Sequence, residues 1–195
     1  MGVSDGLAEL EDRVRSLFSS KASSDYIDAI VRRKNQYSML ESLSALLLLA
    51  SLLKKAGVDT HTLSLLREEG GRPFFKESSL DFSISHSRGI VAVALSDSGR
   101  VGIDIEAAEI DAKKAAQISR RYFGRDEEIS PRELLRLWTE KEAVAKLYGI
   151  PLADFLSMET PAQVNLSEFE IAGHPCTLAY LGEQTVEILP HRRSI

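Results

Sequence analysis

The spacing of hydrophobic residues changes twice along this chain, and the change restricts the folds that it can adopt. Apolar side chains recur at helical spacing, then alternate as in strands, then return to helical spacing before a last strand-like region. The pattern predicts helices at 5–18, 24–33, 37–55, 111–123 and 131–148. It predicts strands between 80 and 106 that turns join into an antiparallel meander, and two or three more strands between 164 and 190. Because helices and strands occur in separate blocks, we expect an α+β protein rather than a doubly wound parallel sheet.

Composition excludes several classes of protein. The 195 residues are 44% hydrophobic and 27% charged, as in ordinary globular proteins, and the net charge of −5 argues against nucleic-acid binding. A single cysteine, Cys176, precludes an internal disulfide and fits a reducing compartment. The apolar run at 43–53 is too short to span a bilayer, and residues 1–17 lack a signal-peptide core. We therefore expect a cytoplasmic monomer that binds neither nucleic acid nor membrane.

Two acids stand in an otherwise apolar predicted strand, VGIDIE at 101–106. Side chains alternate between the two faces of a strand, so Asp104 and Glu106 share the face of Gly102. Residues two apart lie roughly 6.5–7 Å from each other, which lets two carboxylates converge on one cation. Hard divalent cations such as magnesium prefer oxygen ligands of this kind. The alternative is an ordinary solvated face of an edge strand, and the spacing alone does not decide between the two.

The helix predicted at 131–148 carries a third acid. On a helical wheel Glu142 lies about 40° from Trp138, at the flank of the apolar face, so we expect it to be half-buried. A buried carboxylate needs a cation or strong donors, and Lys146, four residues later, could supply one. Alternatively, Glu142 completes a site of three carboxylates with the two strand acids.

Three further segments could bind phosphate. In SISHS, Ser85 and its neighbouring serines alternate while His86 points to the opposite face; a hydroxyl-rich corner beside a histidine suits an anion, although a lone histidine is often structural. In GRP, Arg72 presents a guanidinium on a stiffened turn. The cluster Arg32, Arg33 and Lys34 ends a predicted helix, and either contacts phosphate or is solvated.

Taken in order, GRP, FSISHS, GIDIE, RRYFGRDE and WTEKEAVAK give the sequence a specific resemblance. Residues 70 to 155 resemble the 4′-phosphopantetheinyl transferase superfamily, most closely its surfactin-synthetase-activating type. The resemblance implies transfer of 4′-phosphopantetheine from coenzyme A to a serine of an acyl or peptidyl carrier protein, with magnesium as cofactor. It also implies two similar α+β halves in a pseudo-twofold arrangement, here 1–97 and 98–195, with coenzyme A between them.

The resemblance assigns roles residue by residue. Asp104, Glu106 and Glu142 would be the magnesium ligands, Glu142 would also be the base for the attacking serine, and Lys146 would stabilise charge on the pyrophosphate. Residues expected to contact coenzyme A phosphates are Ser85, His86 and Arg72, the last in place of a family lysine. Glu127 falls at the position of a further family acid.

Some positions depart from the family pattern. Gln36 or Tyr37 stands where a basic residue often holds the 3′-phosphate of coenzyme A, so that contact falls to Arg32, Arg33 or Lys34. Every acid of the motifs and Lys146 are present, which favours an active transferase over a degenerate homologue that only binds coenzyme A or a carrier protein. A purely structural α+β domain would leave these motifs to coincidence.

The resemblance also implies an acidic partner protein, since carrier proteins of this chemistry are typically acidic. With a net charge of −5, attraction must come from a local basic surface. The predicted helix at 111–123 and its exit carry such residues: Lys113, Lys114, Arg120, Arg121 and Arg125. The alternative is a solvated helix face without a partner.

Overall fold

The computed structural model describes residues 3–124, 129–184 and 186–187. It contains helices and strands in the blocks that the hydrophobic pattern predicts, so the mixed helix-and-sheet class is confirmed. The pseudo-twofold relation of two similar halves, and the boundary between 97 and 98, stay predictions. Glu127 and Arg125 lie outside the described residues.

Three helices begin the chain: α1 Val3–Leu17, α2 Lys21–Val31 and α3 Gln36–Lys55. Ser20 caps α2 by accepting from the amide of Ser23, and Asn35 caps α3 by accepting from Tyr37 and Ser38. Gly57, with φ of 74°, follows the end of α3 in the left-handed conformation that glycine adopts readily. The three predicted helices of this region are confirmed, with ends that move by a few residues.

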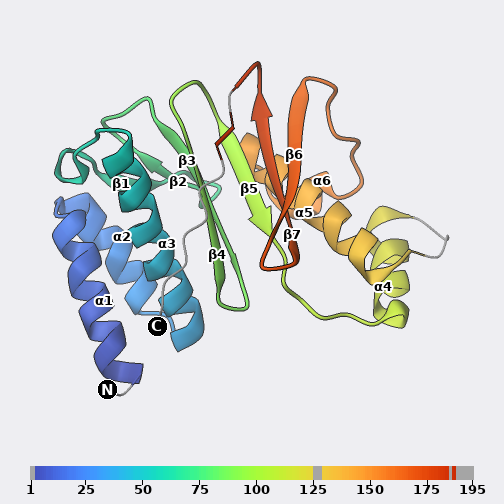
Figure 1. Cartoon of the computed structure of the whole chain (residues 1–195), viewed down its shortest axis with the longest axis horizontal. Helices are drawn as coiled ribbons and strands as arrows, with labels where there is room; N and C mark the ends of the chain where they lie inside the picture. The colour runs from blue at the N-terminus through green and yellow to red at the C-terminus, as the bar shows by residue number, and fades with distance from the viewer. Residues whose placement is uncertain (1–2, 125–128, 185, 188–195) are drawn as a thin grey trace.

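Helix α3 is long and apolar enough, by length and composition alone, to cross a membrane. One such helix is weak evidence, because core helices of globular proteins pass the same test. Here α3 packs between α1 and the strands (Figure 1), and its leucines at 43, 46, 49 and 53 are buried in the core. Its apolar character is explained by this packing.

Two antiparallel hairpins follow the helices. The first joins β1 Leu65–Arg67 to β2 Pro73–Phe75, two short strands that the hydrophobic pattern does not predict. The second joins β3 Asp81–Ser87 to β4 Ile90–Ser96, as predicted, with Arg88 and Gly89 both at positive φ in the turn. Three-residue strands carry too few alternations to be recognised from sequence.

A third sheet contains β5 Val101–Ile105, β6 Val164–Ile171 and β7 His174–Leu181 in the order β5-β7-β6. The expectation of one antiparallel meander through residues 80–106 is therefore wrong at its last strand. Among the described residues β5 forms its backbone ladder with β7, from Val101↔Tyr180 to Ile105↔Cys176. Alternation shows that a segment is a strand, but it does not show which strand is its partner.

The remaining helices cover one end and one face of this sheet (Figure 1). Helix α4, Ala112–Ile118, continues into a π-helical turn at Ser119–Phe123, and a short α6, Leu152–Phe155, follows the long α5, Pro131–Tyr148. The predicted start of α5 is confirmed: Ser130 and Glu133 form a reciprocal capping box.

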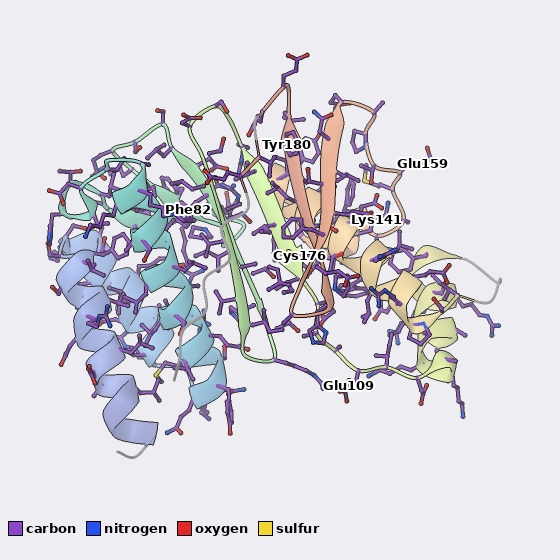
Figure 2. All side chains as sticks on the ribbon, in the orientation of Figure 1. Phe82, Glu109, Lys141, Glu159, Cys176 and Tyr180 are labelled. Atoms are coloured by element: carbon purple, nitrogen blue, oxygen red, sulfur yellow. The ribbon has the colours of Figure 1, made fainter. Side chains whose placement is uncertain are left out.

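Three groups of buried side chains hold the fold together. The first joins the N-terminal helices to β1–β4 and includes Phe82, and the second lies between β4 and one face of the β5–β7 strands and includes Cys176 (Figure 2). The third packs α5 and α6 on the other face of the same sheet, against Ala179. The C-terminal sheet is thus covered on both faces, and α5 lies against the face that carries the strand acids.

Candidate functional site

Gly102 sets the distance between α5 and β5. A Cβ at this position would collide with the carbonyl oxygen of Ala143 and would lie 2.6 Å from the amide nitrogen of Leu147. Only glycine lets the helix backbone come this close to the strand. The close approach places α5 directly beside the next residue on the same strand face, Asp104.

Asp104 is buried, with its side chain only 2% exposed. Its Oδ1 accepts from the Lys146 ammonium at 2.6 Å and from the Ser85 hydroxyl at 2.7 Å. Its Oδ2 is buried and has no hydrogen-bond partner among the described residues. Burying a carboxylate oxygen without a donor costs free energy. A cation or a proton next to the Asp104 carboxylate would reduce this cost.

Glu142, on α5, is a second carboxyl group that interacts electrostatically with Asp104. Burial, followed by the negative charge of Asp104, raises the pKa of the Glu142 carboxyl from 4.5 to about 8, with smaller contributions from a hydrogen bond with Asp104 and from the charge of Glu106, while Lys146 opposes the shift. A protonated Glu142 can donate to an Asp104 oxygen, whereas an ionised one repels it. The half-buried position predicted for Glu142 is confirmed, and the positive charge of Lys146 only partly offsets the effects of burial and of Asp104.

Glu106 lies one step further along the same strand face. Its Oε1 accepts from the Ser87 hydroxyl at 2.6 Å and from the amide of Ala108 at 2.8 Å. One donor is a side-chain hydroxyl on β3 and the other is a backbone amide two residues further along the chain. Together they fix the orientation of the Glu106 carboxylate. The structure therefore brings together the three acids that the sequence singles out, with Lys146 beside them.

His86 faces away from β5, toward α3, as its place in the strand predicts. Its Nδ1 lies 3.0 Å from Glu41 Oε2, and its Nε2 lies 3.5 Å from Ser42 Oγ. Arg33 donates to the same Ser42 hydroxyl at 2.8 Å. The guanidinium of Arg33 and the imidazole of His86 are thus linked through one hydroxyl of α3.

These groups line one cavity of about 300 Å³, hereafter the inner hollow. Its polar lining includes Arg33, Ser42, Ser85, His86, Asp104, Glu106, Glu142 and Lys146. The lining also contains apolar side chains of α2, α3 and β3, namely Tyr26, Ile30, Leu46 and Ile84. A cavity with basic groups, carboxylates and apolar side chains suits a ligand that has both phosphate and ring or alkyl parts.

Arg72 does not fit its predicted contact with phosphate. Its side chain is 7% exposed, and its guanidinium forms a bidentate pair with Asp81 at 2.7 and 2.5 Å. The same group donates to the carbonyl oxygens of Val101 and Lys146. Arg72 therefore ties β2 and β3 to β5 and α5, and it is absent from the described residues that line the inner hollow.

The other predicted phosphate contacts divide into two groups. Ser85 lines the hollow, and its hydroxyl donates to Asp104 and accepts from the amide of Ile105, so its contact with phosphate stays a prediction. Of the basic cluster, Arg33 reaches the hollow, whereas Arg32 is exposed and lies 3.5 Å from Asp28, and Lys34 is exposed. The structure brings Arg33 and His86 to one place and leaves Arg32 and Lys34 at the surface.

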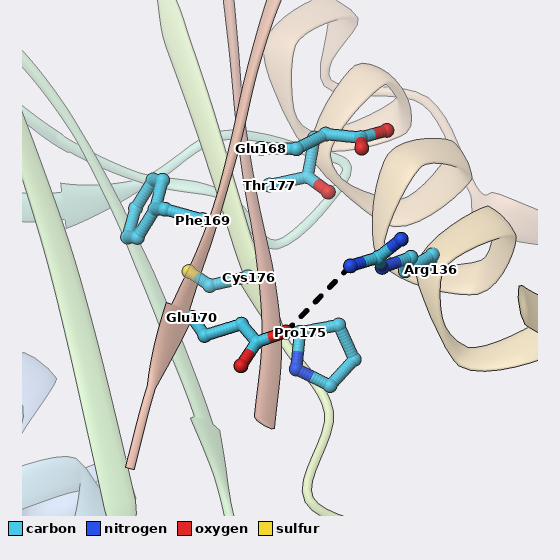
Figure 3. Close-up of a pocket in the computed structure, with 7 residues that line it drawn as sticks. All are labelled: Arg136, Glu168, Phe169, Glu170, Pro175, Cys176 and Thr177. Atoms are coloured by element: carbon cyan, nitrogen blue, oxygen red, sulfur yellow. Dashed lines mark ion pairs between the residues drawn. The ribbon is translucent and has the colours of Figure 1, made fainter. Parts of the chain in front are cut away.

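A second hollow, hereafter the outer hollow, lies on the side of α5 that faces β6 and β7 (Figure 3). It has a volume of about 230 Å³, and Arg136 reaches across it toward Glu170 at 3.6 Å. Glu168 also lines it, as does Cys176. Burial, with a smaller effect of the Asp104 charge, raises the pKa of the Cys176 thiol to about 12, so at neutral pH this sulfur is a protonated core atom rather than a nucleophile.

No three His, Cys, Asp or Glu side chains in the described part of the chain are gathered closely enough to hold a metal ion as they stand. The chemistry of the inner acids nevertheless fits a hard cation, because all three present carboxylate oxygens and one buried oxygen has no donor. In the present arrangement Lys146 supplies the positive charge next to Asp104.

Comparison with known proteins adds a family to this geometry. Residues 100–187 match the model of the 4′-phosphopantetheinyl transferase superfamily. This region is similar to that superfamily. It contains the strand acids, α5 and both hollow-lining faces of the helix, so the resemblance read from the motifs is confirmed at the level of the superfamily. The surfactin-synthetase-activating type stays a prediction.

Individual relatives agree with the superfamily match. The chain is 38% identical over 122 residues to a provisionally named 4′-phosphopantetheinyl transferase of Haemophilus influenzae, over 53% of this chain and 48% of that protein. It is 35% identical over 121 residues to the 4′-phosphopantetheinyl transferase AcpT of Escherichia coli K12, over 55% of this chain and 62% of that one. The match therefore spans about half to three-fifths of these relatives' own length.

Sequence reasoning missed Glu41 and Ser42, which orient His86 from α3. They lie more than forty positions from their partner in the chain and carry no motif, so only the packing of α3 against β3 reveals them. It also left Lys141 of the WTEKE motif without a role. Its ammonium is buried, donates to the carbonyl oxygen of Met158 at 2.5 Å and lies over the ring of Phe155, which ties α5 to α6.

Proposed function

We propose that this protein transfers the 4′-phosphopantetheine group of coenzyme A to a serine hydroxyl of an acyl or peptidyl carrier protein, with magnesium as the divalent cation. The observation that carries the proposal is the buried Asp104 oxygen without a donor, beside Glu142, whose pKa is raised to about 8. Strongly perturbed carboxylates in a cavity are typical of functional sites. The match of residues 100–187 to the model of the superfamily supports the same activity.

Asp104, Glu106 and Glu142 would hold the magnesium ion. They are the carboxylates of the inner hollow, and their mutual repulsion is what a divalent cation would relieve. When bound, the ion supplies positive charge to the oxygens of the pyrophosphate. Their carboxylate chemistry and their place in one cavity support this set of ligands, and binding would require the three side chains to come closer together than they stand.

The basic groups of the hollow would bind the phosphates of coenzyme A. Arg33 and His86 lie together at Ser42, and the ammonium of Lys146 donates to Asp104 and, at 3.2 Å, to the carbonyl of Ile103 on β5. Arg33 takes over the contact that the resemblance assigns to a basic residue near α3. Arg32 and Lys34, which are exposed and next to Arg33 in the chain, would add long-range attraction for a polyanion.

The chemical step needs little beyond orientation and charge. The serine oxygen of the carrier protein attacks the phosphorus next to pantetheine, the new P–O bond forms, and the bond to the leaving adenosine 3′,5′-bisphosphate breaks. Glu142, when ionised, accepts the serine proton. Lys146 stabilises the charge that develops on the bridging oxygen of the leaving group.

Mass spectrometry tests this function directly. Apo forms of acyl and peptidyl carrier proteins are incubated with the protein, coenzyme A and magnesium, and their masses are followed with time. We expect one phosphopantetheine group to be added to one serine, and its replacement by alanine to abolish the addition. If coenzyme A binds in calorimetry but no carrier gains mass, the chain is a binding protein and the proposal fails.

A further inference from the structure

Strands β3 and β5 meet through side chains instead of a backbone ladder. The hydroxyl oxygens of Ser83, Ser85 and Ser87 accept from the amides of Ile103, Ile105 and Ala107, at 3.0, 3.3 and 3.0 Å. At the start of the same row, Asp81 accepts from the amide of Val101 at 2.8 Å. Each acceptor lies twenty positions before its donor, so the two strands run in parallel with a constant offset.

Two of these serines hold an acid as well. Ser85 donates to Asp104 Oδ1 at 2.7 Å, and Ser87 donates to Glu106 Oε1 at 2.6 Å. A serine hydroxyl has one proton, and in both cases it points to the carboxylate while a lone pair receives the β5 amide. The direction of the carboxylate is thus fixed relative to the backbone of its own strand.

Ser83 provides the internal comparison. It accepts from β5 in the same way, and it is buried like Ser85, but within the described residues it donates to no carboxylate. The row of serines therefore contains one member that only joins the strands and two that also orient acids. A purely structural seam would not require the second contact.

The hydrogen bonds from Ser85 and Ser87 to the carboxylates matter because few other contacts restrain the two acids. Within the part of the chain that the structure describes, Asp104 has Lys146 as its other hydrogen-bond donor and Glu106 has only the amide of Ala108. Short hydrogen bonds from a hydroxyl to a carboxylate are among the stronger ones, and they restrict the rotation of an aspartate or glutamate side chain. Without them the carboxylates could turn away from each other to reduce their repulsion.

We propose that Ser85 and Ser87 are positioning residues that hold Asp104 and Glu106 in the orientation needed to bind a divalent cation. The inference rests on the proposed magnesium site and deepens it. The serine row of β3 thus acts on the acids of β5, not on the phosphates of the ligand. Ser87 is the better test, because Ser85 also lines the hollow and could touch a ligand directly.

The experiment compares Ser87→Ala, Ser87→Thr and the control Ser83→Ala. Manganese binding in the presence of coenzyme A is measured by calorimetry and by the electron paramagnetic resonance signal of the free ion, and thermal unfolding is measured without ligand. We expect Ser87→Ala to weaken manganese binding about tenfold. Ser87→Thr, which keeps the hydroxyl, restores it, while Ser83→Ala lowers the melting temperature and leaves manganese affinity as in the wild type.

The outcomes separate this inference from the proposed function, because no carrier protein is present. Equal manganese affinities for Ser87→Ala and Ser83→Ala overturn the positioning role. A Ser87→Thr variant that binds manganese no more tightly than Ser87→Ala overturns it as well. Absence of manganese binding by the wild-type protein overturns it too. If the expected pattern appears but no carrier is modified, the positioning role stands and the transfer function fails.

Discussion

Helix α5 has a hollow on each side, and the two contain similar residues in different surroundings. Glu142 and Lys146 of the helix face Asp104 in the inner hollow, whereas Arg136 faces Glu170 in the outer one. The outer acids are exposed to solvent, while the Asp104 side chain is 2% exposed and has an oxygen without a donor. Charge pairs near the surface contribute little, but a desolvated set of like charges is maintained only at a cost. Desolvation, rather than the number of charges, marks the inner hollow as the site.

Replacing Asp104 should show most clearly that the two hollows differ in their importance for activity. We expect Asp104→Asn to reduce the rate of carrier modification at saturating coenzyme A and magnesium by roughly a hundredfold or more, because a ligand charge is lost without a change of shape. Glu168→Gln in the outer hollow should leave the rate within about threefold of wild type. The rates are followed by mass spectrometry of the carrier. Near wild-type turnover by Asp104→Asn would show that the wrong hollow has been chosen.

The second test uses pH. The pKa of Glu142 is 4.5 in its unperturbed state and about 8 in the fold, so between these values the folded metal-free protein holds a proton that the unfolded chain has lost. Its free energy of unfolding should therefore be highest below pH 4.5, as far as this group is concerned, and fall as pH rises to 8, by on the order of a few kcal/mol.

Urea unfolding at several pH values, with a chelator present, measures the slope of the free energy of unfolding against pH. Glu142→Gln should flatten it and be more stable than wild type at the upper end of the range, because the neutral amide does not repel Asp104. Glu168→Gln, on the other side of α5, should keep the wild-type slope because it leaves Glu142 intact. A slope that is the same in all three proteins would assign the pH dependence to other groups.

The two hollows should also differ, by a smaller factor, in how much their side chains contribute to the affinity for coenzyme A. His86→Ala should weaken coenzyme A binding in calorimetry by about tenfold, because a phosphate contact is lost, and should slow the saturated rate less. Arg136→Ala, which removes a cation from the outer hollow, should leave the affinity for coenzyme A unchanged. A variant of His86 that binds normally but reacts slowly would instead give the imidazole a part in the chemical step.

The smallest effect concerns a surface outside both hollows. Lys113 and Lys114 are exposed on α4, and we predict that they attract an acidic carrier protein. The double variant Lys113→Glu and Lys114→Glu should raise the Michaelis constant for the carrier several-fold at low salt and reduce its salt dependence. The constant for coenzyme A should not change. Identical carrier kinetics for variant and wild type would exclude this helix from the docking surface.

Much of the fold could be predicted because its signals are local. The capping box at Ser130 and the leucine pattern of α3 involve residues within a few positions of each other. The short strands β1 and β2 and the pairing of β5 with β7 could not be predicted in this way. Their partners are set by which faces become buried together, which depends on the whole chain.

The candidate site divides along the same line. From the sequence alone, alternation placed Asp104 and Glu106 on one strand face, helical spacing placed Glu142 at the flank of its helix, and the motif order indicated the superfamily. Only the tertiary structure decided that Arg72 pairs with Asp81 instead of reaching the cavity, and that the serines of β3 hold the acids of β5. A side chain's chemistry and its face follow from local geometry, but its partner depends on which segments distant in the chain share its burial, because desolvated polar groups must find each other.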